Sequence, residues 1–448
     1  MKFLYLCADQ GIPILGAKGA SVHVREFVSA LMNQDHSVSL VCAKQGNGNE
    51  IGRLSITEIA PQMSVAPESY IASLRAQISS LPSSKDMSQD PTLLLTAEIK
   101  KLAYNLQMRR ALERIIADIQ PDVLYERYAL FNYAGSIVAR KYHLPYLLEV
   151  NAPLIQERQA SSGMILTDLA QRIEDQVFRQ ADYVTAVSAI LRDYAIERGV
   201  DPARATVIPN GVDLTKFNPT LGNEDDKITN LQALLLPAAL LQRTVIGFVG
   251  SLKPWHGVDI LIQAFARAHR ADPRLFLLIV GEGPQLEHLR SETQRQGLSD
   301  HIYFCGAVPH HLVPKYIALM NIAVAPYRHQ TRFYFSPLKI LEYMAMGKPV
   351  IATRQGQITE LIEHEQNGLL CEAENVESLA DALIRLAHDP HLQHRFGKNA
   401  AATVAERHSW LQVADQVTRL VDSLPTPAAR LTTISTPRSE HALPRTRI

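Results

Sequence analysis

The stretch that decides the fold covers residues 333–352 and reads FYFSPLKILEYMAMGKPVIA. Ser336 is a favourable helix N-cap, and Pro337 suits the first helical position because a backbone N–H would have no partner there. Gly347 is expected to end the helix and Pro349 to prevent its return. The Val-Ile-Ala that follows predicts a strand, so we expect one helix–strand step of an α/β domain.

The start of this predicted helix favours an anion. The backbone N–H groups of Leu338 and Lys339 would point out of the positive end of the helix dipole, and the Lys339 ammonium adds a full charge. Glu342 lies one turn later among apolar residues, where a carboxylate seldom occurs without a partner. One interpretation places phosphates at the helix tip and ribose hydroxyls at Glu342. The other is a core helix with a solvated lysine and a paired glutamate.

The composition is that of an ordinary globular protein. The chain has 448 residues, 46% hydrophobic and 20% charged, and its length predicts two or three domains. Lys plus Arg and Asp plus Glu balance at 45 each, which argues against bulk binding to nucleic acid. The four cysteines are scattered and the N-terminus begins directly with a strand-like run, so we expect reduced thiols and a cytoplasmic protein.

The first half of the chain opens like a Rossmann-like domain. A strand at 3–8 precedes a glycine-rich loop at 11–21, a helix to about Asn33 and a strand at 38–43. The loop lacks G-x-G-x-x-G, and it fails as a P-loop because Lys18 comes one residue late and no Ser or Thr follows it directly. NAD binding and ATP hydrolysis are therefore poorly supported.

Polar residues follow two further predicted strands, at 122–125 and 145–150. Glu126 and Arg127 come directly after the first strand, and Asn151 follows the second. Ligands of open parallel sheets bind outside the carboxyl ends of the strands. We therefore expect these side chains near the same cleft as the glycine-rich loop.

The second half repeats the pattern. A strand at 245–249 leads into a glycine-bearing turn at 250–257, and a strand at 275–280 leads into another. The chain is therefore expected to contain two Rossmann-like halves. Residues 425–448 are rich in Pro, Thr, Ser and Arg and lack apolar periodicity, which predicts a disordered tail.

Two further patterns allow more than one interpretation. The predicted helix at 96–118 has a basic side, which could be solvated or could touch the inner face of a membrane. His388, His391 and His394 recur every three residues, but no Cys or carboxylate completes a zinc site. We interpret them as surface histidines and expect no metal.

The stretch at 333–352 resembles the donor-site motif of the family 4 retaining glycosyltransferases of the GT-B fold. The resemblance extends from the first strand to about residue 424. It implies an α/β fold in which two Rossmann-like domains face each other across a cleft. In that family two glutamates usually stand with seven residues between them. The second matches Glu342, whose family role is to hold the donor ribose, and the first would fall on Tyr334, which is not a carboxylate.

The resemblance also implies the domain limits, because the Pro-Asn-Gly turn at 209–211 is similar to the junction between domains in that family. The expected division is an N-terminal acceptor-side domain at 1–208, a C-terminal donor domain at 209–408, a helix at 409–424 that crosses back to the N-terminal domain, and the tail at 425–448.

The implied donor site departs from the family pattern at two cations. Most relatives supply an Arg and a Lys to the donor pyrophosphate from the turn at 250–257, where this chain has Ser251 and His256. Lys253, Arg332 and Lys339 are the candidate replacements. The residues implied to contact the donor are Gly16, Lys18, Gly19, Gly250, Ser251, Lys253, His256, Gly281, Glu282, Gly283, Val308, Arg332, Tyr334, Ser336, Pro337 and Leu338.

Four residues are expected to act at the reaction centre, namely Lys339, Glu342, Asn151 and His23. Asn151 stands near the place where many relatives contact the donor sugar with a His or an Asp. His23 fits a site role and a satisfied helix histidine equally well. Glu126 and Arg127 are expected on the acceptor side.

The activity that the resemblance implies is transfer of a sugar from a UDP- or GDP-sugar to a hydroxyl of a sugar, glycan or glycolipid acceptor. Retention is expected, with front-face attack, no cofactor, and a role in polysaccharide or glycoconjugate assembly. No carboxylate pair can be assigned as nucleophile and general acid. Two alternatives stay open, a nucleotide-sugar epimerase or hydrolase, and a degenerate binding protein to which Tyr334, Ser251 and His256 would point.

Overall fold

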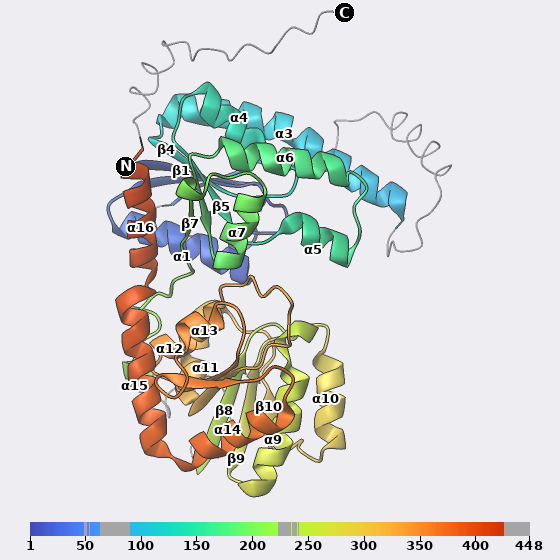
Figure 1. The fold of residues 1–448 in the computed structure, drawn as a ribbon, viewed down its shortest axis with the longest axis vertical. Coiled ribbons are helices and arrows are strands. Elements are labelled where there is room, and N and C mark those ends of the chain that lie inside the picture. Colours follow the sequence, from blue (N-terminus) through green and yellow to red (C-terminus); the bar gives the residue numbers. More distant parts are fainter. Residues whose placement is uncertain are drawn as a thin grey trace, which may run out of the picture.

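The computed structural model describes residues 1–48, 52, 54–62, 90–222, 234, 240 and 242–424. It contains two α/β domains, one above the other in Figure 1, each built on its own parallel sheet. The expected two-domain fold is therefore confirmed. The tail at 425–448 lies outside the described residues.

The N-terminal sheet has seven strands in the order β3-β2-β1-β4-β5-β6-β7. Its central strands are buried on both faces, which is why they read as apolar runs. The strands are β1 (Lys2–Cys7), β2 (Ser37–Cys42), β3 (Ser55–Glu58), β4 (Val123–Arg127), β5 (Tyr146–Val150), β6 (Tyr183–Ala186) and β7 (Ala205–Val207). The helices around it are α1 (Gly19–Asn33), α3 (Pro91–Ile119), α4 (Ala134–Lys141), α5 (Leu154–Ser161), α6 (Thr167–Gln180) and α7 (Ala189–Glu197).

The C-terminal sheet has six strands in the order β10-β9-β8-β11-β12-β13. The strands are β8 (Thr244–Val249), β9 (Leu275–Val280), β10 (Ile302–Phe304), β11 (Ile322–Ala325), β12 (Val350–Thr353) and β13 (Gly368–Cys371). The helices are α9 (Val258–Ala271), α10 (Leu286–Arg295), α11 (Val313–Leu319), α12 (Leu338–Ala345), α13 (Ile358–Leu361), α14 (Val376–His388) and α15 (Pro390–Arg407). Short 3-10 turns occur at Pro202–Arg204, Pro219–Gly222, Pro254–His256 and His310–Leu312.

The strand orders fix where ligands can bind. Strand order reverses between β1 and β4 in the first sheet and between β8 and β11 in the second. Each reversal opens a crevice at the carboxyl ends of the strands.

The predicted helix at the centre of the deciding stretch is α12, followed by β12 as expected. Gly347 after it has φ +64°, a left-handed conformation that favours glycine. The prediction that Ser336 caps the helix is wrong. Pro337 takes the N-cap position and makes no side-chain cap bond, while the Ser336 hydroxyl accepts a hydrogen bond from the backbone N–H of Asn210 at 3.0 Å.

One more helix, α16 (Trp410–Asp422), follows α15 and runs alongside the N-terminal domain (Figure 1). Its Trp410, Val413 and Val417 side chains join the same apolar core as β1 and α1. Ser409 and Gln412 form a capping box at its start. The chain therefore crosses between the domains twice, and Val212 pairs with Ser409 where the two crossings meet.

None of the helices in the described part of the chain is long and apolar enough to span a membrane.

Candidate active site

Lys339 is the central charged group of the C-terminal crevice. Its Nζ atom is buried and has no hydrogen-bond partner among the described residues. It lies 4.2 Å from the ring centroid of Phe248 and 5.2 Å from that of Tyr327. Burial lowers the pKa of this ammonium to about 7, against an opposing effect of Glu342. An anion in this crevice would supply the missing partner.

The turn after β8 approaches this ammonium closely. Gly250 has φ +147°, and a Cβ added to it would lie 2.5 Å from the Lys339 Nζ atom. The positive φ favours glycine at this position. The backbone of this turn and the lysine are therefore immediate neighbours.

The two positions at which relatives carry cations provide no buried positive charge. The His256 ring donates from Nδ1 to the Ser251 carbonyl, and it packs edge-on against Tyr327 with centroids 5.3 Å apart. Burial, followed by the nearby Lys339 charge, lowers the pKa of His256 to about 3, so this ring is neutral near pH 7. The Lys253 ammonium stacks over the ring of Trp255 at 4.7 Å.

Glu342 is buried with 8% of its surface exposed. His310 donates a hydrogen bond from Nε2 to Glu342 Oε1 at 2.8 Å. The expectation of a partner for this carboxylate is thus confirmed. The sequence did not single out His310.

The turns after β8, β9 and β10 pack against one another. Gly281 has φ +140°, and a Cβ there would lie 1.9 Å from the Gly250 carbonyl oxygen. Its N–H donates to Gly306 at 2.8 Å, and the Glu282 carbonyl accepts from Leu252 at 2.8 Å. The predicted donor residues Gly281 to Gly283 therefore border the turn that carries Gly250, and Val308 follows the Gly306 turn.

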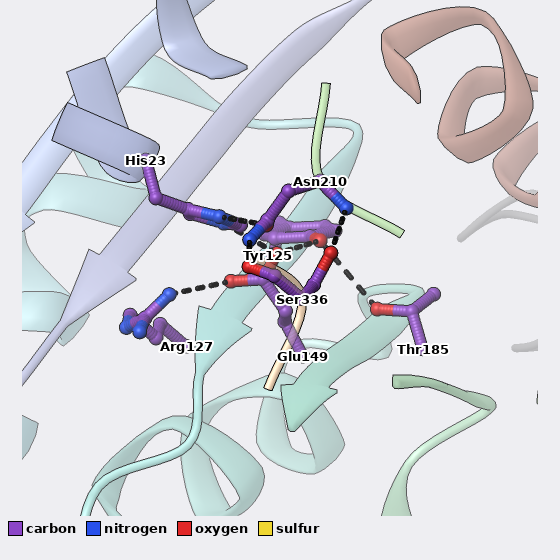
Figure 2. A network of polar contacts seen from close by, with 7 residues as sticks. All are labelled: His23, Tyr125, Arg127, Glu149, Thr185, Asn210 and Ser336. Carbon is purple, nitrogen blue, oxygen red and sulfur yellow. Dashed lines mark hydrogen bonds and ion pairs between the residues drawn. The ribbon is translucent and has the colours of Figure 1, made fainter. Parts of the chain in front are cut away.

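His23 is the hub of a buried network in the N-terminal domain (Figure 2). Its Nε2 lies 2.7 Å from Glu149 Oε1 and its Nδ1 lies 2.6 Å from Asn210 Oδ1. The Asn210 amide nitrogen donates to the Ser336 carbonyl at 2.9 Å, which turns its oxygen toward the histidine. Both ring nitrogens therefore lie within hydrogen-bond distance of a side-chain oxygen.

Glu149 carries the negative charge of this network. Burial alone would raise the pKa of its carboxyl, but His23 and Arg127 outweigh burial and lower the pKa to about 2. Arg127 contributes an ion pair at 3.3 Å and Tyr125 a hydrogen bond at 3.1 Å. The carboxylate is therefore ionised and its charge is neutralised locally.

The other predicted acceptor-side and reaction-centre residues differ in exposure. Glu126 is fully buried, and its two carboxylate oxygens accept from Tyr146 at 2.8 Å and from Asn132 at 2.5 Å. Burial raises the pKa of Glu126 to about 7. Asn151 is half-buried beside Glu149, and Arg332 is exposed.

The glycine-rich loop meets the tip of α12 across the cleft. A Cβ on Gly19 would lie 3.9 Å from the Leu338 side chain. The Gly16 carbonyl accepts from Arg25 at 2.5 Å, and Lys18 donates to the Gly11 carbonyl at 2.9 Å. The predicted residues of this loop thus lie next to the predicted donor helix, although Lys18 itself is tied to the loop.

Tyr334 connects the two domains. Its hydroxyl donates to Glu157 of α5, and its carbonyl accepts from the Ser188 hydroxyl at 2.8 Å. The Gln357 amide also donates to the Val187 carbonyl of the N-terminal domain at 2.8 Å. At the position where relatives carry a carboxylate, this chain carries Tyr334, which donates a hydrogen bond to a carboxylate of the N-terminal domain.

Glu149, Asn210, Glu157 and His310 were not singled out from the sequence. A signal existed for Glu149, because a carboxylate inside an apolar strand needs a buried partner. Asn210 was interpreted as turn chemistry only. The other two lie in segments without a motif.

Two domains facing each other, with these glycine turns and the α12 tip at their junction, define a GT-B type α/β protein. Two family models match the chain, "Glycosyltransferase Family 4" over residues 17–216 and "Glycosyl transferases group 1" over residues 243–389. The chain belongs to the group 1, family 4 glycosyltransferases, as the motif resemblance indicated.

Individual proteins of known name are similar to this chain at low sequence identity. An alpha-D-kanosaminyltransferase of Streptomyces kanamyceticus is 30% identical over 39% of this chain and 44% of the relative. A D-inositol 3-phosphate glycosyltransferase of Corynebacterium efficiens is 28% identical over 67% of this chain and 71% of the relative. The solved structure of Anabaena Alr3699/HepE in complex with UDP and glucose superposes with a TM-score of 0.65 at 20% identity, over 95% of this chain and 100% of that one. This last likeness concerns the fold.

Proposed function

We propose that the protein transfers a glycosyl group from a nucleotide-sugar donor to an acceptor hydroxyl, with retention at the anomeric carbon. The observation that carries the proposal is the buried, unpartnered Lys339 ammonium at the tip of α12, facing the Gly250 turn. A diphosphate in this crevice would receive the ammonium and the first backbone N–H groups of the helix. Glu342, held by His310, would accept from the ribose hydroxyls.

The proposed mechanism relies on position and charge. The acceptor hydroxyl would attack from the face that the diphosphate leaves, and the leaving phosphate oxygen would take its proton. The chain then has to orient two substrates and to stabilise the negative charge that grows on the diphosphate. Lys339 carries the second task, since His256 is neutral and Ser251 bears no charge.

A UDP-sugar is the first donor to test, because the structural neighbour binds UDP and glucose. We also propose a role in glycoconjugate assembly, close to the inner face of a membrane. The exposed side of α3 supports this placement, since Leu93 and Leu106 are 60% and 55% exposed on a helix that also carries Arg110 and Arg114.

The proposal is tested by a thermal-shift screen of the full-length protein against UDP, GDP, ADP and their sugar conjugates. A ligand that binds only the folded state raises the melting temperature. We expect a shift with one nucleotide and release of the diphosphate when the matching sugar conjugate and an acceptor are present. Turnover without any acceptor would instead indicate a hydrolase or epimerase. Binding without turnover under all conditions would indicate a degenerate binding protein.

A further inference from the structure

A cavity of about 190 Å³ lies in the N-terminal domain at the strand reversal between β1 and β4. Its walls include the residues that follow β1 and β4 together with side chains of α3 and α5. This is the crevice in which open parallel sheets bind ligands. It is smaller than the roughly 300–1,000 Å³ of drug-sized sites, so it suits a small ligand.

Two cations converge on this cavity. Lys101 of α3 and Arg158 of α5 both line it, and both are half-buried. Within the described residues neither side chain forms an ion pair. Burial lowers the pKa of Lys101. The charge of Asp9 opposes this effect, and the weaker effect of Arg158 lowers the pKa further. Two like charges that lie close together favour a further anion beside them.

Two carboxylates, those of Asp9 and Glu157, also line the cavity, and both accept hydrogen bonds from groups other than the two cations, as does the neighbouring Glu98. Asp9 accepts from the backbone N–H of Gly11 at 2.7 Å. Glu98 accepts from the N–H of Leu166 at 2.7 Å. Glu157 accepts from the hydroxyl of the donor-domain residue Tyr334. None of these acids lies within ion-pair distance of Lys101 or Arg158 in the described structure.

A buried acceptor atom completes the set. Asn132 lines the cavity, is only 4% exposed, and its amide nitrogen is occupied by Glu126. Its Oδ1 atom is buried without a hydrogen-bond partner among the described residues. A ligand hydroxyl would satisfy this oxygen. The cavity thus offers two cations for an anion and one acceptor for a hydroxyl.

We propose that this Lys101–Arg158 pocket binds the acceptor and that the acceptor carries an anionic group, a phosphate ester or a carboxylate, beside its hydroxyls. The inference rests on the proposed function and narrows its acceptor class. Arg158 can hold such a group with two parallel hydrogen bonds. The contact between Glu157 and Tyr334 places the pocket beside the loop that leads into α12, so that an acceptor held here borders the donor crevice.

Binding is tested first with inorganic phosphate by calorimetric titration of the full-length protein. The titration uses a Lys339→Met background, so that the α12 tip does not take up the phosphate. We expect phosphate to bind and its affinity to fall roughly 10- to 100-fold in Arg158→Gln and in Lys101→Gln, the range for losing a hydrogen bond to a charged group. Arg110→Gln, an exposed residue of α3 outside the pocket, should leave the affinity unchanged.

Transfer assays on the otherwise native protein provide the second measurement, with glucose 6-phosphate, glucuronate and glucose as acceptors. We expect one of the anionic acceptors to exceed glucose in kcat/KM by about tenfold or more. In Arg158→Gln this preference should disappear because the KM for the anionic acceptor rises, while the KM for the donor stays constant. The phosphorylated sugar and the uronate distinguish the two sources of negative charge.

The inference is overturned if phosphate does not bind, if both pocket variants bind it like Arg110→Gln, or if glucose is used as well as its anionic counterparts. Failure of the proposed glycosyl transfer would give a different result from failure of the acceptor proposal. In that case no nucleotide raises the melting temperature of the native protein, whatever the phosphate titration shows.

Discussion

At the scale of single residues, the site depends on charges that are buried and either unpaired or paired across the fold. Lys339 exemplifies the first kind and Glu149 the second. A buried ammonium without a partner is unfavourable in the free protein. It is therefore available to a ligand anion, whereas the charge of Glu149 is fully used by its neighbours.

Replacing Lys339 by Met should lower the rate of diphosphate release by about 100- to 1,000-fold, the range for removing one preorganised group that stabilises developing charge. Steady-state kinetics with a saturating donor measures the effect. Lys398→Met is the matched control, because Lys398 is exposed on α15. Equal rates in the two variants would exclude Lys339 from the diphosphate site.

The affinity for the donor should depend on pH through the same residue. Because burial lowers the pKa of Lys339 to about 7, the free protein loses this charge as the pH rises above 7. We expect the Kd of UDP-glucose, whose diphosphate does not titrate in this range, to be constant below pH 7 and to rise by up to about tenfold per pH unit above it. In Lys339→Met the Kd should be high and independent of pH, and a wild-type Kd that stays flat to pH 9 would contradict this assignment.

Glu149 and Glu126 should respond in opposite ways to neutralisation. The folded-state pKa of Glu149 is lowered to about 2, so its stabilisation of the fold is present above the unfolded-state pKa and is lost as the pH falls toward 2. Removing one partner of a buried ion pair costs about 3–5 kcal/mol, which we expect for Glu149→Gln at pH 7. The pKa of Glu126 is raised to about 7, so Glu126→Gln should leave stability unchanged or increase it at pH 8. Urea unfolding of both variants measures this, and similar losses in both would refute the distinction.

At the scale of elements, α16 stabilises the N-terminal domain although it follows the C-terminal one in the chain. Trp410 is 4% exposed and its ring meets His23 edge-on at 5.1 Å, whereas the adjacent Leu411 is 48% exposed. Trp410→Ala should therefore lower the free energy of unfolding by about 3–5 kcal/mol, the usual loss for a buried large side chain. Leu411→Ala, one position along the same helix, should change it by less than about 0.5 kcal/mol. Equal effects on the urea midpoint would mean that α16 does not anchor the domain.

The same scale shows what the sequence could predict. Residues 333–352 gave α12, Gly347 and β12 because capping, glycine and proline signals are local. The prediction that Ser336 caps α12 was wrong because its hydroxyl accepts a hydrogen bond from Asn210, 126 residues away in sequence. His310 was missed for the same reason, since its bond to Glu342 spans 32 residues. Local chemistry thus located the helix and its charges, and tertiary contacts decided their partners.

At the scale of the whole molecule, the two domains are held together by two chain crossings and by a few hydrogen bonds across the cleft. The crossings meet at Val212 and Ser409. The contacts between the domains include the hydrogen bonds of Tyr334 and Gln357 and an ion pair of Lys216 with Glu26 at 2.8 Å. Hydrogen bonds of this kind contribute only about 1 kcal/mol each. The arrangement allows the domains to open around the crossings while each keeps its own core.

Tyr334→Phe tests whether this closure matters. The substitution removes the hydroxyl that reaches Glu157 and keeps the ring, which packs on Phe335 with centroids 4.4 Å apart. We expect a larger radius of gyration by small-angle X-ray scattering and a rate reduced by about 3- to 15-fold, the equivalent of one ordinary hydrogen bond. Tyr303→Phe, on the exposed face of β10, is the matched control. Since the hydroxyl of Tyr334 joins the donor domain to the helix that carries Arg158, an unchanged radius together with an unchanged rate would mean that the domains close without this contact.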